Sequence, residues 1–157
     1  MDYRVRLCKA EQGDLDDIEE WLQDPDVRFK MVGKDEETTA VCYTTSQRRE
    51  FYMIVQNCDD RTVGYIELAD MHPASGRAEI KMCIGSGADR GKGYGQEALE
   101  QMTTTLLGRG FESIYLRVLT ENTPAVRCYE KAGFIKTGIL RDYGLAHHAM
   151  FLMEYPG

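Results

Sequence analysis

Two stretches of the sequence combine residue types that could bind an anion and move a proton. The first is Arg90-Gly91-Lys92-Gly93-Tyr94-Gly95, in which three glycines alternate with other residues behind an arginine. Such glycines let backbone N–H groups point into one concavity, and a helix that begins there adds unpaired N–H groups and the positive end of its dipole. Arg90 and Lys92 add positive charge. This segment predicts a site for phosphate or pyrophosphate, although a tight turn that merely joins a strand to a helix would have a similar composition.

Two common phosphate-binding motifs do not fit the glycine-rich segment. A dinucleotide fingerprint that begins at Gly91 needs a glycine where the chain has Gln96. A P-loop built on Gly91-Lys92 needs glycine at position 86 and serine or threonine at position 93, where the chain has Ser86 and Gly93. The anion site must therefore belong to another class.

The second stretch runs from Asn122 to Phe134. Asn122 lies at the end of a predicted strand, and Tyr129 follows seven positions later, two helical turns along, so both side chains can face the same side. Taken alone, Asn122 could be a capping residue, Tyr129 a helix residue that packs on a sheet, and Gly133 a helix stop.

The hydrophobic pattern predicts the elements that must position these residues. Strands are expected at 3–9, 51–56, 77–84, 113–119, 134–140 and 149–155, with a further strand from Thr62 or Val63 to Leu68. Helices are expected between Asp14 (the N-cap) and Asp24, at 26–31, between Gly95 and Gly108, and between Thr123 and Gly133. The apolar face of the helix after Gly95 should hold Ala98, Leu99, Met102, Leu106 and Leu107. The order β-α-α-β-β-β-α-β-α-β-β predicts an α/β (α+β) mixed sheet in one domain, residues 1–157.

Both stretches together resemble the GNAT superfamily of acetyl-CoA-dependent N-acetyltransferases. The acetyl-CoA motif of that superfamily, Q/R-x-x-G-x-G/A, is matched from Arg90 to Gly95, and the element order matches over nearly the whole chain. A later signature is matched by Asn122, Ala125, Tyr129, Glu130, Lys131, Gly133 and Phe134. The resemblance implies a central, mostly antiparallel sheet with one splayed strand pair, flanked by helices. Arg6-Leu7, Trp21 to Arg28 and Gly138 to Asp142 are similar to the RimJ/RimL-type and aminoglycoside 6′-N-acetyltransferase-like branches.

The resemblance also implies where acetyl-CoA (coenzyme A) binds and which residue is the acid. Backbone groups of Met82, Cys83 and Ile84 would pair with the pantetheine arm, and Arg90 to Gly95 would hold the pyrophosphate. Asn122 would bond the cofactor or order the start of its helix, and Ala125 would lie beside it. Transfer would occur directly in a ternary complex, with Tyr129 protonating the leaving sulfur. Cys83 is then not needed as a nucleophile.

The acceptor amine must lose a proton, because an ordinary alkylamine is mostly charged at pH 7. Glu79 is the first candidate for the base that removes the proton, directly or through water, and Glu67 on the neighbouring strand is the second. Strand alternation places Glu79, Lys81 and Cys83 on one face, so Glu79 could equally be a solvent-facing cross-strand partner.

Composition limits the function classes. Acidic residues number 26 against 19 basic ones, for a formal charge of −7, which argues against nucleic acid as a partner. The sequence shows no signal peptide and no apolar run long enough for a membrane span, so we expect a cytoplasmic protein without a membrane partner. Five cysteines without a C-x-x-C pair indicate reduced thiols, and no metal site is expected. In a strand, His147 and His148 would point to opposite faces and would not bind one metal ion together.

The charge favours a small cationic amine as acceptor: a polyamine, an aminoglycoside or an amino sugar. A protein N-terminal acetyltransferase of the RimJ/RimL kind is the alternative within the enzyme class. The alternative outside the enzyme class is a non-catalytic acyl-CoA-binding module. The presence of Tyr129 argues against that alternative. Exposed strand edges and the final hairpin leave a homodimer possible.

Overall fold

The computed structural model of the chain describes residues 2–23, 49–85, 87–141 and 149–156. Its strands are β1 (Val5–Lys9), β2 (Glu50–Gln56), β3 (Thr62–His72), β4 (Arg77–Ile84), β5 (Ser113–Leu119), β6 (Ile135–Leu140) and β7 (Met150–Tyr155). Its α-helices are α1 (Leu15–Leu22), α3 (Tyr94–Gly108) and α4 (Thr123–Lys131), with short 3-10 turns at Gln12–Asp14 and Gly87–Asp89. The strands and helices predicted within these ranges are all present. The expected helix at 26–31 and the histidine pair at 147–148 lie outside the described residues.

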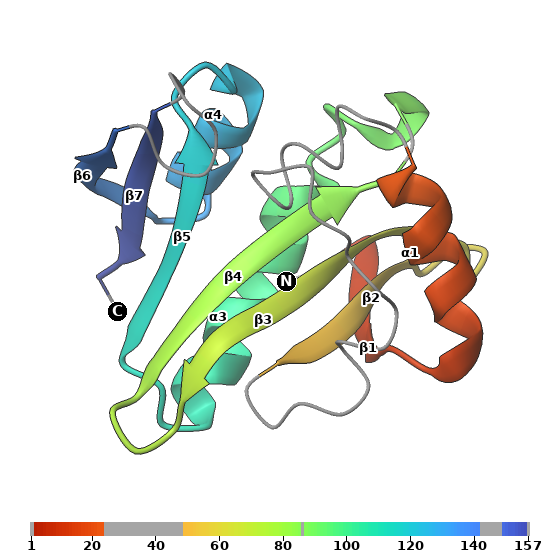
Figure 1. Ribbon diagram of the computed structural model, residues 1–157. Helices are drawn as coiled ribbons and strands as arrows, with labels where there is room; N and C mark the ends of the chain where they lie inside the picture. The colour runs from red at the N-terminus through yellow and green to blue at the C-terminus, as the bar shows by residue number, and fades with distance from the viewer. Residues whose placement is uncertain (1, 24–48, 86, 142–148, 157) are drawn as a thin grey trace.

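The strands form one seven-stranded sheet in the order β1-β2-β3-β4-β5-β7-β6. Strands β1 to β4 pair antiparallel, as do β5, β7 and β6, whereas β4 and β5 pair in parallel. The parallel ladder joins only Arg77–Glu79 of β4 to Ser113–Tyr115 of β5. Beyond these residues the two strands diverge (Figure 1), which confirms the mostly antiparallel sheet with a splayed strand pair.

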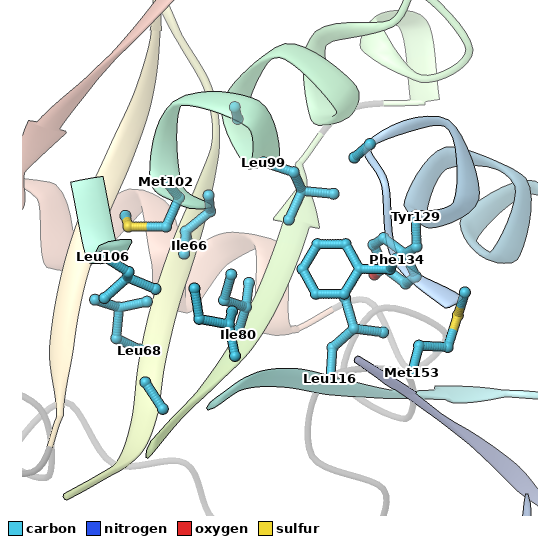
Figure 2. Close-up of a cluster of buried hydrophobic side chains, with 14 of the residues drawn as sticks. Ile66, Leu68, Ile80, Leu99, Met102, Leu106, Leu116, Tyr129, Phe134 and Met153 are labelled. Carbon is cyan, nitrogen blue, oxygen red and sulfur yellow. The ribbon is translucent and has the colours of Figure 1, made fainter. Parts of the chain in front are cut away.

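Apolar side chains cover both faces of the sheet. The larger cluster packs α3 and α4 against one face and includes Ile66, Ile80, Leu99, Leu116 and Phe134, each 3% exposed or less. Figure 2 shows this cluster, with Leu68 and Leu106 at one end and Tyr129 at the other. The smaller cluster packs α1 against the opposite face: Leu15, Ile18 and Leu22 contact Phe51, Met53, Val55, Tyr65 and Cys83. The two clusters fix α3, α4 and α1 around the splay.

Three details differ from the sequence prediction. Leu107 is 38% exposed while Leu106 is fully buried, because successive helix residues lie about 100° apart and Leu106 occupies the position facing the sheet. Asp14 stands at the N-cap of α1, but its carboxylate accepts the backbone N–H of Glu11 at 2.8 Å instead of capping that helix. Strand β3 continues past Leu68 to His72 across an irregularity between Ala69 and His72.

The irregularity in β3 places Asp70 in the left-handed region, with φ of 48°. Its carboxylate accepts a hydrogen bond from the Tyr115 hydroxyl at 2.5 Å and lies 3.2 Å from the Arg77 guanidinium. The ring of His72 lies 2.7 Å from its other oxygen. These partners lower the pKa of Asp70, the Tyr115 hydroxyl most of all. The side chain of Asp70 thus ties β3 to β5 over the closed end of the splay.

None of the described helices is long and apolar enough to span a lipid bilayer.

Candidate active site

A cleft of about 660 Å³ lies between the diverging strands β4 and β5 and the amino-terminal end of α3, with α4 along one side. It contains nearly every residue predicted for the cofactor. The lining includes Met82, Cys83, Ile84, Arg90, Gly91, Gly93, Tyr94, Gly95, Asn122, Ala125 and Tyr129. Lys92, Glu79 and Glu67, also predicted for the site, do not line it.

The wall formed by β4 is open because the ladder to β5 stops early. Its last pair joins Glu79 to Tyr115, while on its other edge β4 remains paired with β3 as far as Ile84. The edge of β4 at Met82 and Ile84 therefore faces the cleft instead of a neighbouring strand. A strand edge of this kind can pair with the amide groups of an extended ligand.

The glycine-rich segment forms the end of the cleft at the start of α3. Gly91 and Gly93 have φ of 76° and 86°, a backbone conformation that residues with a side chain rarely adopt. Successive N–H groups in such a turn form a concave anion site. Gly95 serves close packing instead: a Cβ there would lie 2.7 Å from the methyl group of Met82. Of the three alternating glycines noted in the sequence, Gly91 and Gly93 adopt positive φ, whereas Gly95 lies inside α3.

The charges along the cleft suit a polyanion. Its lining includes the basic residues Arg90, Arg127 and Lys131, together with Arg117, whose charge is matched by Glu79. The acidic residue in that lining, Asp89, is paired with Arg61 through two hydrogen bonds of 2.9 Å. The Arg61 guanidinium lowers the pKa of the Asp89 carboxyl. The ion pair neutralises Asp89, and it also ties the loop before Arg90 to the turn between β2 and β3.

Tyr129 lies at the buried side of the cleft, where it is 9% exposed and packs in the larger apolar cluster. Burial raises the pKa of its hydroxyl well above the ordinary value, so the group keeps its proton at neutral pH. A neutral phenol in a cleft is suited to give a proton to a leaving anion. Asn122 stands at the N-cap of α4, but its side chain makes no capping hydrogen bond, and its backbone carbonyl accepts the Val126 N–H at 3.0 Å.

Comparison with known proteins agrees with this geometry. The sequence profile of the Acetyltransferase (GNAT) domain matches residues 4–135. The chain is a GNAT acetyltransferase. Membership in this family makes it an acetyl-CoA-dependent N-acetyltransferase, and the open strand edge, the glycine turn and the basic lining fit coenzyme A.

Two curated relatives match over most of their length. An uncharacterized N-acetyltransferase, p20, of Bacillus licheniformis is 30% identical over 155 residues, covering 89% of this chain and 84% of the relative. A spermidine N(1)-acetyltransferase of Vibrio cholerae is 27% identical over 154 residues, with the same coverage. Among solved structures, spermidine N-acetyltransferase from Vibrio cholerae in complex with CoA and spermine has a TM-score of 0.86 at 19% identity, covering 98% of this chain and 95% of that one. This last likeness shows the fold.

The two carboxylates predicted as bases of this GNAT acetyltransferase lie on the face of the sheet that α1 covers. Glu79 is 3% exposed and accepts two hydrogen bonds from Arg117, at 2.6 and 2.9 Å. Glu67 is 6% exposed and lies 2.8 Å from Arg49. Glu79 is a cross-strand partner, paired with the half-buried Arg117 on the parallel strand β5, but the expectation that it could face solvent is wrong, because it is 3% exposed. Arg117 also lines the cleft and so connects Glu79 to it.

Several cleft residues of the GNAT fold were not predicted. Arg127 and Lys131 lie four positions apart on α4, and this spacing places both on one helix face, a signal that the sequence did contain. Cys128 is half-buried in the cleft, where burial raises the pKa of its thiol to about 11. Arg117 could not have been found without knowing that β5 lies beside β4.

Proposed function

We propose that this GNAT acetyltransferase transfers the acetyl group of acetyl-CoA to a primary amine of a small cationic molecule, and that a polyamine is the first acceptor to test. The observation that supports a polyamine most is the 27% identity to a spermidine N(1)-acetyltransferase over 89% of the chain. The net charge of −7 agrees with a cationic acceptor, although it does not name one.

On this proposal each wall of the cleft has a separate role. Acetyl-CoA supplies an activated acetyl thioester. The turn from Arg90 to Gly95 binds the pyrophosphate, and the open edge of β4 at Met82 to Ile84 binds the pantetheine arm. Tyr129 holds its proton at neutral pH and gives it to the departing sulfur as the general acid. Cys83 and Cys128 stay outside the chemistry as packing residues.

The acceptor amine loses its proton to a carboxylate on the face covered by α1. Glu79 is the first candidate, because Arg117 joins it to the cleft, and Glu67 is the second. Arg117 fixes the position of the Glu79 carboxylate through both of its oxygens. The proton could move directly or through one water molecule.

The acceptor proposal is tested by offering the enzyme acetyl-CoA and four kinds of amine: spermidine, an aminoglycoside, an amino sugar and a peptide with a free N-terminus. Mass spectrometry then identifies the acetylated product. We expect the highest kcat/KM for spermidine. Preferred transfer to the peptide would favour the RimJ/RimL-like alternative. Tight binding of CoA without transfer to any amine would favour the non-catalytic module.

Self-association is a further part of the proposal. The outer strand β6 exposes Ile135 and Ile139, at 52% and 50%, on the edge of the sheet. One solved relative is described as the dodecameric structure of spermidine N-acetyltransferase from Vibrio cholerae. Light scattering of the purified protein tests the proposal: we expect at least a dimer, and an Ile135→Lys, Ile139→Lys variant that is monomeric.

A further inference from the structure

The outer side of the glycine turn is held by a residue from the far amino-terminal end of the chain. Arg4, directly before β1, donates a hydrogen bond from Nη2 to the backbone carbonyl of Lys92 at 2.6 Å. Its Nε and its backbone N–H donate to the two carboxylate oxygens of Glu97, each at 2.6 Å. Its guanidinium also lies 4.9 Å from the centre of the Tyr94 ring. Arg4 is thus bound to the turn and to the first turn of α3 at once.

The hydrogen bond to Lys92 determines which way the next N–H group points. In a planar trans peptide the carbonyl and the following N–H point in opposite directions. The carbonyl of Lys92 points to Arg4, so the N–H of Gly93 points to the other side. Gly91 and Gly93 line the cleft, whereas Lys92 and Arg4 do not. The N–H of Gly93 is therefore turned toward the cleft.

We infer that Arg4 is a positioning residue for coenzyme A: by holding the carbonyl of Lys92 it presents the N–H of Gly93 to the pyrophosphate. The inference rests on the use of acetyl-CoA, which family membership establishes, and it does not depend on which amine is the acceptor. Gly93 has φ of 86°, and a glycine can readily rotate to other backbone conformations. The hydrogen bond from Arg4 restricts this rotation.

Weaker CoA binding after loss of Arg4 could also arise from charge repulsion alone. A substitution of Glu97 distinguishes this explanation from the loss of orientation. Glu97 lies in the first turn of α3, and its side chain is paired with Arg4. Loss of Arg4 would leave this carboxylate unpaired near the phosphates and repel them. If repulsion were the whole effect, removing Glu97 as well would restore binding. If orientation is the cause, binding stays weak in the double variant.

The test uses Arg4→Met, which keeps an unbranched apolar stem and removes every donor, and the double variant Arg4→Met, Glu97→Gln. Arg6→Met is the matched control, since Arg6 lies two residues away and forms an exposed ion pair with Asp60 at 2.7 Å. Titration calorimetry with CoA gives Kd. We expect Arg4→Met and the double variant to bind CoA about tenfold more weakly, the size of one weakened hydrogen bond to a charged acceptor, and Arg6→Met to stay within about twofold.

A donor without the pyrophosphate separates loop orientation from general damage to the fold. With S-acetylpantetheine as donor, kcat/KM of Arg4→Met should equal that of the native enzyme. With acetyl-CoA as donor, the KM of Arg4→Met should be higher than the native KM, and its kcat should be unchanged. An equal loss for both donors, a CoA affinity within about twofold of the native one, or full restoration in the double variant would each overturn the inference. If no amine is acetylated, the proposed acceptor is wrong, and binding replaces the kinetics. Pantetheine is then titrated by calorimetry in competition with CoA, and its Kd should be the same for Arg4→Met and the native protein. Arg4→Lys keeps a cation and a donor, and it should retain an affinity between those of Arg4→Met and the native protein.

Discussion

Arg117 on β5 binds both carboxylate oxygens of Glu79 on β4, at the strand pair where the ladder between β4 and β5 ends. The two strands diverge from this point, so the ion pair is a side-chain bridge at the closed end of the cleft. Arg117 lines the cofactor cleft, while Glu79 lies buried on the face that α1 covers. The bridge links the donor side of the enzyme to the carboxylate proposed as its base.

Breaking this bridge should destabilise the fold. Arg117→Met leaves the buried Glu79 carboxylate without the two hydrogen bonds that compensate its burial. We expect the free energy of unfolding to fall by roughly 3 kcal/mol, measured by urea denaturation. Arg6→Met, which breaks an exposed pair with Asp60, should change it by less than about 1 kcal/mol. Equal stability of the Arg117→Met variant and the native protein would contradict the role assigned to the bridge.

Tyr129→Phe removes the proposed general acid and keeps the packed ring. We expect kcat to fall by about 100-fold while Kd for CoA stays within about twofold, because only the proton donor is lost. Tyr155→Phe is the control, since Tyr155 packs against Phe134 at a ring distance of 5.4 Å and does not line the cleft. Turnover by Tyr129→Phe at the native rate would remove Tyr129 from the mechanism.

The two candidate bases can be ranked by a pair of amide variants. Glu79→Gln and Glu67→Gln keep the size of each side chain and remove its ability to accept a proton at neutral pH. We expect kcat to fall by at least about 30-fold in Glu79→Gln and by less in Glu67→Gln, with CoA affinity kept in both. Steady-state kinetics at saturating acetyl-CoA measures this. A larger loss of kcat in Glu67→Gln than in Glu79→Gln would identify Glu67 as the base.

The Asp89–Arg61 pair predicts a specific dependence of stability on pH. Because the pKa of Asp89 is lower in the folded protein than in the unfolded chain, the pair stabilises the fold above the ordinary aspartate pKa of about 4. This contribution is lost as the pH falls toward the lowered value. Asp89→Asn should therefore be less stable than the native protein at pH 7, and the difference should shrink in acid. A difference that stays constant from neutral pH into acid, in denaturation curves, would show that the pair does not contribute in this way.

The thiols should differ in reactivity. The pKa of Cys128 is raised to about 11 by burial, so little thiolate exists at pH 7.5, whereas Cys58 is exposed in the turn after β2. Iodoacetamide should modify Cys58 well before Cys128, as followed by peptide mass spectrometry. Faster modification of Cys128 would indicate an activated thiol in the cleft, contrary to a direct ternary-complex transfer.

Much of the fold follows from local patterns. Alternating residues or short apolar runs between turn residues predicted the strands, and Pro124, Gly108 and Gly133 marked helix ends. A glycine-rich turn before α3 was predicted from composition, and the positive φ of Gly91 and Gly93 is a conformation that glycine adopts readily. The extension of β3 to His72 was missed, since the left-handed conformation of Asp70 depends on partners far along the chain.

The partners of buried charged side chains depend on the order of the strands in the sheet, which local sequence patterns do not reveal. Glu79 was expected either as a base or as a solvent-facing residue, and only the parallel pairing with β5 places Arg117 beside it. Arg4 and Arg61 lie far in sequence from the glycine turn, yet Arg4 binds its middle at Lys92 and Arg61 binds Asp89, directly before it. Such contacts arise from packing between distant segments and leave no periodic signal.

The most direct test of this account is acetyl transfer from acetyl-CoA to spermidine by the native protein, with N-acetylspermidine and free CoA measured together. We expect equal amounts of both products, and a higher kcat/KM for spermidine than for an aminoglycoside, an amino sugar or a peptide with a free N-terminus. Release of CoA without N-acetylspermidine, or transfer to the peptide but to no small amine, would contradict it.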